Sequence, residues 1–255
     1  LAGVAAAALA AERAMPPDRI AWARPLRPGD ENELSILGWD ADTAWVAIEM
    51  GGPGMGIVPA DKLAELPSRA LDGEMVRRAS VDARGLERVV PSAEAHMRAR
   101  SLARIGASFE ILGAATALTD LAVRYTNDRE QFGRPLSEFQ ALQHLLSECQ
   151  VDLAALSSLC DAALEEWSAN GASELAAAAK SLAGRAGRRI AQRTLQCMGA
   201  IAFTEEHAHH RFARRIHTLD AWFGTSSELE RELGAAIRAN RRAPHGIEIW
   251  HPGPR

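Results

Sequence analysis

The chain has 255 residues, 47% of them hydrophobic and 24% charged, and these values are ordinary for a globular protein with an ample core. Its formal charge of -4 argues against general attraction to nucleic acid or to a membrane surface. Cys149, Cys160 and Cys197 are spaced too widely for a disulfide framework or a zinc site. They indicate buried thiols in a reducing, cytoplasmic location.

The first segment, residues 1–15, is rich in alanine and lacks a basic flank. We expect a helix that packs on another part of the protein, not a signal peptide. No run of about 18 apolar residues occurs, so no membrane span is expected. Because the chain opens without a methionine, the sequence leaves open that further residues precede it.

Residues 16–92 show the pattern of a small β domain, with short apolar segments separated by turns. A plain hairpin turn is expected at Gly51–Gly54, because no helical pattern and no Lys-Ser/Thr pair follow to make a phosphate loop. The expected strands are Arg19–Ala23, Leu34–Leu37, Thr43–Met50, Gly56–Val58, Met75–Val81 and Leu86–Val90.

Residues 93–242 are predicted to be helical throughout. Apolar residues recur at helical spacing in a first segment (Leu102, Ile105, Phe109, Leu112 and Val123) and in a second (Leu142, Leu145, Leu146, Cys149, Leu153, Leu156, Cys160, Leu164 and Trp167). Asn170-Gly171 ends the second, and further helices are expected at Ser173–Met198, Glu205–Trp222 and Ser226–Arg241. The fold class is therefore mainly α, an up-down four-helix bundle preceded by a small partial β domain, with residues 243–255 as an extended tail.

The two longest helices are joined by Asp128–Pro135. Gly133 can end the first helix in a left-handed conformation, and Pro135 cannot continue it. Ser137 and Gln140 have the spacing of a capping box that would open the second helix. By itself this pattern favours a plain helical hairpin with one solvated arginine, Arg129.

Several segments, taken together and in order, resemble the acyl-CoA dehydrogenase family over most of the chain. They are Arg129–Pro135 with Phe139-Gln140, the turn Gln196–Thr204, the helix with Glu206-His207, His210 and Arg214-Arg215, the segment Trp222–Thr225, and the strand region Thr43–Pro59 with Leu71-Asp72. The resemblance implies the fold of that family's C-terminal bundle and half of its β domain.

The resemblance also implies FAD, lying at the contact between two subunits. By position, Arg129 would meet the pyrophosphate, where a guanidinium forms paired charge-assisted hydrogen bonds. The other cofactor-binding candidates are Phe132, Gln140, Gln196, Gly199 and Thr225. Structural alternatives stay open: Phe132 as a core residue, Gln140 as a capping residue and Gln196 as an exposed helix end.

The departures from the family concern catalysis. The family removes a proton with a glutamate, and both positions known for this base lack a carboxylate here, since they hold Phe223 and Ala103. Ala200 and Ala202 stand where glycine is usual and would crowd a close backbone approach to the cofactor. The family's N-terminal helical domain and first half of its β domain have no counterpart in these residues, so we expect no complete active site from this chain alone.

Other polar groups are interpreted structurally. His207, His209 and His210 lie near Glu205 and Glu206, but adjacent histidines point to different helix faces, which disfavours a metal site. Glu110 is expected to be a surface or core-paired carboxylate. The arginines near the end of the chain are explained by helix faces and salt bridges more simply than by DNA: Arg211, Arg214, Arg215, Arg238, Arg241 and Arg242.

The interpretation is a non-catalytic subunit that shares FAD with an acyl-CoA dehydrogenase homologue in a heterotetramer. The complex would desaturate an acyl-CoA thioester in fatty acid or sterol side-chain β-oxidation, part of lipid metabolism, and would pass electrons to an electron-transfer flavoprotein. Two alternatives remain: a homo-oligomeric flavoenzyme with an unrecognised base, and a non-enzymatic interaction or nucleic-acid-binding relative.

Overall fold

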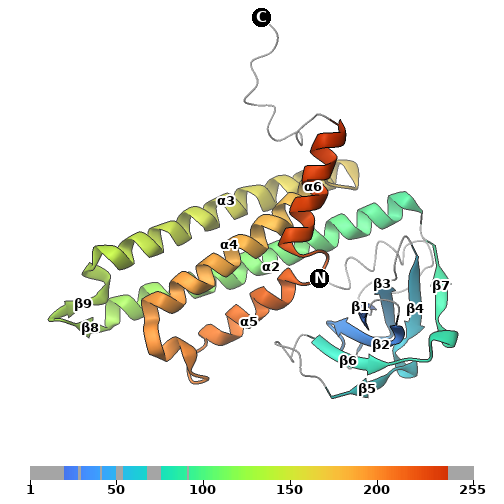
Figure 1. Cartoon of the computed structure of the whole chain (residues 1–255), viewed down its shortest axis with the longest axis horizontal. Coiled ribbons are helices and arrows are strands. Elements are labelled where there is room, and N and C mark those ends of the chain that lie inside the picture. Colours follow the sequence, from blue (N-terminus) through green and yellow to red (C-terminus); the bar gives the residue numbers. More distant parts are fainter. Residues whose placement is uncertain are drawn as a thin grey trace, which may run out of the picture. The chain divides into compact units, whose positions relative to one another are not determined.

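The computed structural model describes residues 20–27, 30–40, 42–49, 54–67, 76–90 and 92–240. The chain divides into two compact units, Leu1–Ala103 and Arg104–Arg255 (Figure 1). The helix expected at residues 1–15, most of the turn at Gly51–Gly54 and the tail at 243–255 lie outside the described residues.

The first unit holds one seven-stranded sheet, in the order β5-β6-β2-β1-β3-β4-β7. β1 and β3 run parallel, and the other neighbours are antiparallel. The bounds are β1 Ile20–Arg27, β2 Asp30–Leu37, β3 Trp45–Glu49, β4 Met55–Pro59, β5 Ala64–Leu66, β6 Val76–Ser80 and β7 Glu87–Val89. All the expected strands are present. Among the described strands of this sheet β5 was missed, because this short edge strand has no buried residue and so no apolar signal.

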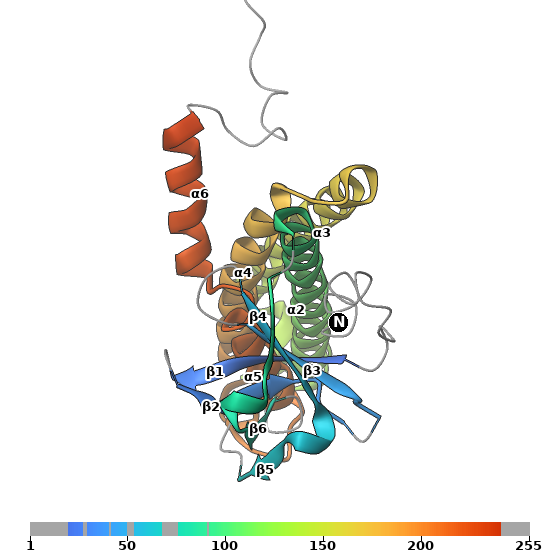
Figure 2. The same cartoon turned by 90° about the vertical axis from the view of Figure 1, so that its right-hand side faces the viewer.

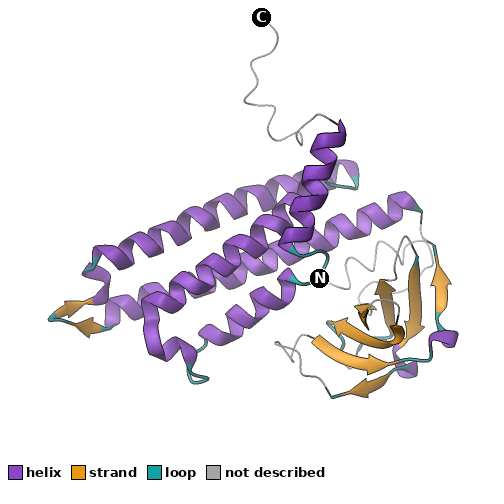
Figure 3. Cartoon of the chain, in the orientation of Figure 1, coloured by secondary structure: helices purple, strands orange, loops and turns teal. Residues whose placement is uncertain are grey.

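The sheet curls on itself (Figure 3). β2 and β7 are four strands apart in the sheet order, which would separate them by about 19 Å in a flat sheet. Yet Arg88 of β7 donates a hydrogen bond of 2.8 Å to Glu31 of β2. Inside the curl the strands share an apolar core of Ala21, Ala23, Leu34, Ile36, Val46, Ile48, Val58, Ala79, Val81 and Leu86.

The helices follow the predicted order. Their bounds are α2 Ala93–Asp128, α3 Gln140–Asn170, α4 Leu175–Met198, α5 His209–Asp220 and α6 Ser226–Asn240, with the 3-10 turns η4 Leu136–Glu138 and η5 Gly199–Phe203 between them. Gly171 ends α3 with a φ of 73°, as the sequence predicted. α5 is shorter than expected, because the residues after η5 form turns up to His209.

α4 is the central helix of the bundle, and α3, α5 and α6 pack against it (Figures 1 and 2). Its buried side chains are mostly those of alanine and glycine, which allow close approach. A Cβ added to Gly187 would lie 2.8 Å from methyl groups of Ile111 and Ile216. A helix that is buried on most sides needs small residues on most sides.

The predicted buried faces are partly correct. In α3, Cys149, Leu153, Leu156 and Cys160 are buried as expected, but Leu164 is 39% exposed. In α2, Ile105 is buried, whereas Val123 is 36% exposed and was wrongly assigned to the core. The fully buried Ile111 and Leu118 were missed, because the small residues beside them obscure the apolar period.

The three cysteines are free and buried, as the sequence indicated. Burial raises the pKa of the Cys149 thiol to about 11 and that of the Cys160 thiol to about 12. Both thiols are therefore protonated and unreactive at neutral pH.

One of the described helices, α2, is long and apolar enough to cross a membrane by length and composition alone, which the sequence did not lead us to expect. In the structure, 56% of its most apolar stretch is buried. This is the condition of a core helix in a soluble protein, so the stretch is weak evidence for a membrane span.

Candidate functional site

Between α2 and α3 the chain forms a short β-hairpin rather than a simple helix end. β8 (Glu130–Gln131) pairs with β9 (Arg134–Pro135), and the two residues between them have positive φ, 56° for Phe132 and 81° for Gly133. Such a pair of left-handed residues is the signature of a type I′ hairpin turn. The expectation that Gly133 ends the first helix was therefore wrong, because α2 ends earlier, at Asp128.

The expected capping box is also absent. α3 begins at Gln140 with Phe139 as its cap, and no side chain caps it. Ser137 lies in the 3-10 turn η4, and its carbonyl accepts a hydrogen bond of 2.8 Å from Gln143. The turn that follows Pro135 shifts the helix start, so Gln140 is exposed and has no capping role.

The hairpin presents a cation and an aromatic ring to solvent. Phe132 is 90% exposed, which excludes the core alternative, and its ring lies edge-on to Phe139 with 6.1 Å between centroids. The Arg134 guanidinium lies 4.1 Å from the centroid of the Phe139 ring. Arg129 is exposed, and it takes part in none of the ion pairs found between described residues. The hairpin therefore offers a free guanidinium beside an exposed aromatic face.

The end of α4 lies at the same end of the bundle (Figure 1). Gln196 is exposed in its last turn, and Gly199 ends the helix with a φ of 64° and nothing within 4 Å of an added Cβ. An apolar cluster joins this region to α2 and to the start of α3: Ala122, Tyr125, Leu142, Leu145, Leu146, Leu195, Cys197, Met198, Ile201 and Ala202. We call the group Arg129, Phe132, Gln140, Gln196 and Gly199 the hairpin-end cluster.

The hairpin-end cluster holds residue types that could bind one end of a dinucleotide. Its members are exposed side chains or open backbone, and an arginine and a phenyl ring are suited to phosphate and to a heteroaromatic ring. Ala202, expected to crowd the cofactor, is 2% exposed and packs inside the apolar cluster, whereas Ala200 is exposed.

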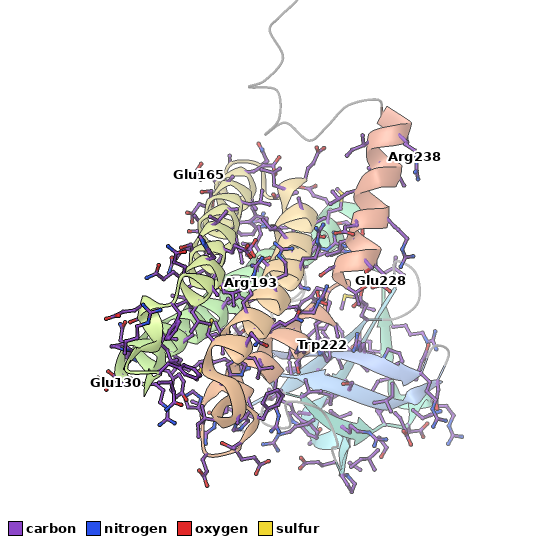
Figure 4. The ribbon with its side chains drawn as sticks, turned by 60° about the vertical axis from the view of Figure 1, so that its left-hand side comes forward. Glu130, Glu165, Arg193, Trp222, Glu228 and Arg238 are labelled. Atoms are coloured by element: carbon purple, nitrogen blue, oxygen red, sulfur yellow. The ribbon has the colours of Figure 1, made fainter. Side chains whose placement is uncertain are left out.

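The sixth candidate, Thr225, lies elsewhere. It precedes α6, close to Lys180 in the first half of α4, and 16 residues of helix, about 24 Å, separate Lys180 from Gln196. Figure 4 labels Glu228 near this turn and Glu130 on the distant hairpin. The Thr225 amide and hydroxyl both donate to Glu228, each at 2.9 Å, so a carboxylate already occupies the helix start. An anionic cofactor group does not fit there.

The turn before α6 is tightly held. Phe223 has a φ of 62°, and its carbonyl accepts a hydrogen bond of 3.2 Å from Arg104 Nε. Lys180 Nζ donates to the carbonyls of Asp220 and Gly224, at 3.2 and 3.3 Å. These cations come from α2 and α4, so two helices fix the backbone of the turn.

Charges in this turn are paired and desolvated. The Asp220 carboxylate forms an ion pair with Arg188, lies 4.0 Å from Lys180 Nζ and accepts a hydrogen bond of 2.5 Å from Ser226 Oγ. Burial lowers the pKa of the Lys180 ammonium to about 8, although Asp220 opposes this shift. This network was not predicted from the sequence. Its only signal there was a lysine within an alanine run, Ala176–Lys180.

Neither position expected for a catalytic base can accept a proton in this structure. Phe223 is 8% exposed and Ala103 is 2% exposed. The nearby carboxylates are engaged: Glu232 binds Arg104 at 2.9 Å, and Glu110 forms an ion pair with Arg215. The prediction that Glu110 is a paired carboxylate is confirmed.

The histidines near α5 have structural partners. His209 is buried, and its Nε2 lies 3.1 Å from Thr194 Oγ1 and 3.2 Å from the Ala191 carbonyl. Burial lowers the pKa of His209, and His207 and His210 lower it further. Within the described ranges, no three histidine, cysteine or acidic side chains group in a way that could hold a metal ion.

The fold defines a class, a helical-bundle domain preceded by a small β unit, and the exposed groups at the hairpin end of the bundle are its candidate site. The family model described as acyl-CoA dehydrogenase, C-terminal domain, matches residues 93–237, which is more than half of the chain. This chain belongs to the acyl-CoA dehydrogenase family.

Curated relatives include acyl-CoA dehydrogenase FadE34 of Mycobacterium tuberculosis, 33% identical over 156 residues, with 60% of this chain and 22% of that protein covered. Another is 3-sulfinopropanoyl-CoA desulfinase of Paraburkholderia xenovorans, 32% identical, covering 55% of this chain and 36% of the relative. A third is acyl-CoA dehydrogenase IpdE2 of Mycolicibacterium smegmatis, 34% identical, covering 50% and 40%. The chain thus spans less than half the length of these relatives.

Solved structures share the fold of both units. A variant of the steroid ACAD Tcur3481-Tcur3483 has a TM-score of 0.70 at 24% identity, with 87% of this chain and 63% of that chain covered. The ChsE4-ChsE5 complex from Mycobacterium tuberculosis has a TM-score of 0.71 at 19% identity, with 87% and 67% covered. The predicted fold class, a bundle preceded by a partial β domain, is confirmed.

Proposed function

We propose that this chain is the non-catalytic subunit of a heteromeric, FAD-dependent acyl-CoA dehydrogenase. The partner is a homologous subunit that supplies the base, and the complex desaturates an acyl-CoA thioester between its α and β carbons. The observation that carries the proposal is the apolar side chain at each base position, Phe223 and Ala103. Electrons leave through an electron-transfer flavoprotein.

The reaction class explains why those two residues matter. Removing the α-proton of a thioester at neutral pH needs a positioned proton acceptor. A phenyl ring and a methyl group cannot take a proton, and the described carboxylates closest to the turn bind Arg104, Arg188 or the start of α6. A carboxylate that is held in an ion pair is a poor base. The base therefore comes from another subunit.

The hairpin-end cluster is the part of this chain that serves the cofactor. When bound, FAD supplies the acceptor for the hydride that leaves the β carbon. Arg129 binds its pyrophosphate, because a free guanidinium forms two parallel hydrogen bonds to phosphate oxygens. Phe132 covers an aromatic face, and Gln140 and Gln196 offer amide groups. The open backbone at Gly199 admits close approach.

We leave Thr225 out of this cofactor site. Its hydroxyl and amide both donate to Glu228, and the carboxylate of Glu228 would repel a phosphate. In this structure Thr225 caps α6, and the cofactor role that the family resemblance implies for it stays a prediction.

The comparisons support a heteromer without deciding it. One similar solved structure is a complex of two differently named components, ChsE4 and ChsE5, and another is described as a steroid ACAD. A bulky acyl group, such as a sterol side-chain thioester, is accordingly the substrate class we propose.

The test is the visible absorption spectrum of the chain purified alone and of the chain co-expressed with a full-length homologue. We expect flavin bands only in the co-purified complex, bleached on addition of an acyl-CoA. The matched control is the homologue expressed without this chain, which separates its own flavin from shared flavin. Stoichiometric flavin and turnover in this chain alone would refute the proposal.

A further inference from the structure

The turn from Asp220 to Thr225 is held in a conformation that its sequence does not favour. Phe223 has a φ of 62°, and a bulky residue in the left-handed region is a true outlier. A turn with no other requirement would place glycine or asparagine there. Backbone strain of this kind persists only where the surroundings impose it, and it is found at functional positions.

Two buried cations impose this strained conformation on the turn. Arg104 is 6% exposed and Lys180 is fully buried, and both donate to backbone carbonyls of the turn, those of Asp220, Phe223 and Gly224. Because the acceptors are carbonyl oxygens, these bonds do not depend on which side chain stands at position 223.

The rest of the turn is constrained as well. Gly224 has a φ of 100°, and a Cβ added there would lie 2.8 Å from Leu229, so both the backbone conformation and the packing require glycine. Asp220 accepts from both the amide and the hydroxyl of Ser226, which locks the turn to the start of α6. The turn is therefore determined by α2, α4 and α6 together, each of which contributes contacts to backbone or caps.

We propose that Arg104 and Lys180 are positioning residues that fix the backbone conformation of the turn. The side chain at position 223 can therefore be exchanged without a change in that conformation. The inference rests on the proposed function in one respect, that position 223 is where a related chain carries its base. In this chain position 223 holds a phenyl ring, on a turn whose backbone carbonyls are bonded by Arg104 and Lys180.

The first test is a double-mutant cycle, read by hydrogen exchange of the Leu229 amide, which donates to the Thr225 carbonyl at 2.9 Å. Arg104→Gln should speed this exchange by about tenfold in the parent chain, because the strained Phe223 then relaxes. In the Phe223→Gly background the same change should speed it by only about twofold, because glycine adopts positive φ unaided. Arg104→Lys, which keeps the charge and one donor, should lie between the two.

The matched control is Arg185→Gln. Arg185 is an exposed arginine of α4 whose ion pair is with Glu230 of α6, beyond the turn. Its replacement should change the exchange of the Leu229 amide equally in both backgrounds. An equal effect of Arg104→Gln with Phe223 and with glycine at this position would overturn the proposal, since it would show that the cation only adds stability.

The second test measures whether the side chain at position 223 is held in a buried environment. Phe223→Glu is compared with Phe223→Gln in the isolated chain without flavin. The position is 8% exposed and beside Trp222, so burial should raise the pKa of the introduced carboxyl. The Arg104 guanidinium and the Lys180 ammonium, which donate to carbonyls of the same turn, oppose this shift, and we expect burial to be the larger effect. The pKa is read by NMR titration. Since the folded pKa is raised, the stability of the glutamate variant relative to the glutamine variant should fall as pH rises through that range.

An ordinary pKa for the introduced carboxyl would show a side chain turned to solvent and would overturn the proposal. Neither test uses the cofactor or the partner. A failure of the flavin experiment therefore leaves these outcomes unaffected, and the two proposals fail separately.

Discussion

The two ends of α4 use charge in opposite ways. In its first half, the fully buried Lys180 lies close to Asp220, which also pairs with Arg188 in the middle of the helix. Near its end, Gln196 and the neighbouring Arg129 are exposed, and Arg129 has no ion pair with the described residues. In the first region the charged groups are bonded within the chain, whereas in the second region Gln196 and Arg129 are exposed, although Arg193 nearby pairs with Asp152.

The contrast separates structural from binding roles among residues that look alike in sequence. A buried charge has to be paired, because an unpaired one is costly, so its partners are found within the chain. An exposed arginine gains little from surface pairing and can serve a ligand. Mutations in the two regions should therefore differ in kind: those near Lys180 should destabilise the bundle, and those near Arg129 should affect binding alone.

The largest effect is expected from Asp220→Asn. It leaves the buried Lys180 without its anion and should lower the free energy of unfolding by about 3–5 kcal/mol, while the partly exposed Arg188 also loses its partner. Urea unfolding monitored by helical circular dichroism measures this change. The matched control, Asp161→Asn on the exposed side of α3, should change stability by less than about 0.5 kcal/mol. Equal effects of the two substitutions would contradict the proposed difference between buried and exposed charged groups.

The next effect is expected from Gly184→Ala. An added Cβ would overlap Asp220 and Ser226, so the change should destabilise the bundle by about 3 kcal/mol through overpacking. Gly113→Ala in α2, with nothing within 4 Å of its Cβ, should instead stabilise by about 0.5–1 kcal/mol. The same unfolding experiment distinguishes them. A neutral Gly184→Ala would show that α6 can move away from α4 at little cost.

A smaller free-energy effect is expected from Arg129→Gln, and in binding rather than stability. The variant should unfold within about 0.5 kcal/mol of the parent chain. Its complex with the homologue should retain flavin about tenfold more weakly, because a charge-assisted contact to phosphate is lost. Equilibrium dialysis of the co-purified complex measures the affinity. Arg124→Gln, at an exposed position of α2, is the control and should retain flavin normally.

The smallest effect concerns His209 and pH. Its pKa in the folded chain is lowered, first by burial, so the unfolded chain binds this proton more readily. Stability should be fully present above the ordinary pKa of about 6.5 and should decline as pH falls below it. Unfolding free energies across pH 5–8 should show this slope in the parent chain but not in His209→Gln. His217→Gln, at an exposed position of the same helix, should keep the slope.

Much of the fold could be predicted from apolar periodicity. The long helices, the stop at Gly171 and the main strands follow from local patterns. The hairpin could not be predicted, because Phe132-Gly133 lacks the Asn-Gly or Asp-Gly signal of its turn type. The capping-box pattern from Ser137 to Gln140 is present in the sequence, but the chain direction after Pro135 overrides it.

The network around Lys180 was beyond sequence reasoning for a different reason. Lys180 and Asp220 are 40 residues apart, and their meeting depends on how closely α4 approaches the end of α5. Small residues such as Gly184 allow that approach, but glycine in a sequence does not say which side chain fills the space. The candidate cofactor residues came from family resemblance, and their role stays a prediction.

The buried thiols allow the opening of the bundle to be measured by chemical labelling. With the pKa of Cys149 at about 11 and that of Cys160 at about 12, a thiol reagent added at neutral pH meets almost no thiolate and no accessible sulfur. Modification then waits for the helices to part. The rate of labelling consequently reports how readily α3 opens from α4. It can be measured by mass spectrometry without any introduced probe.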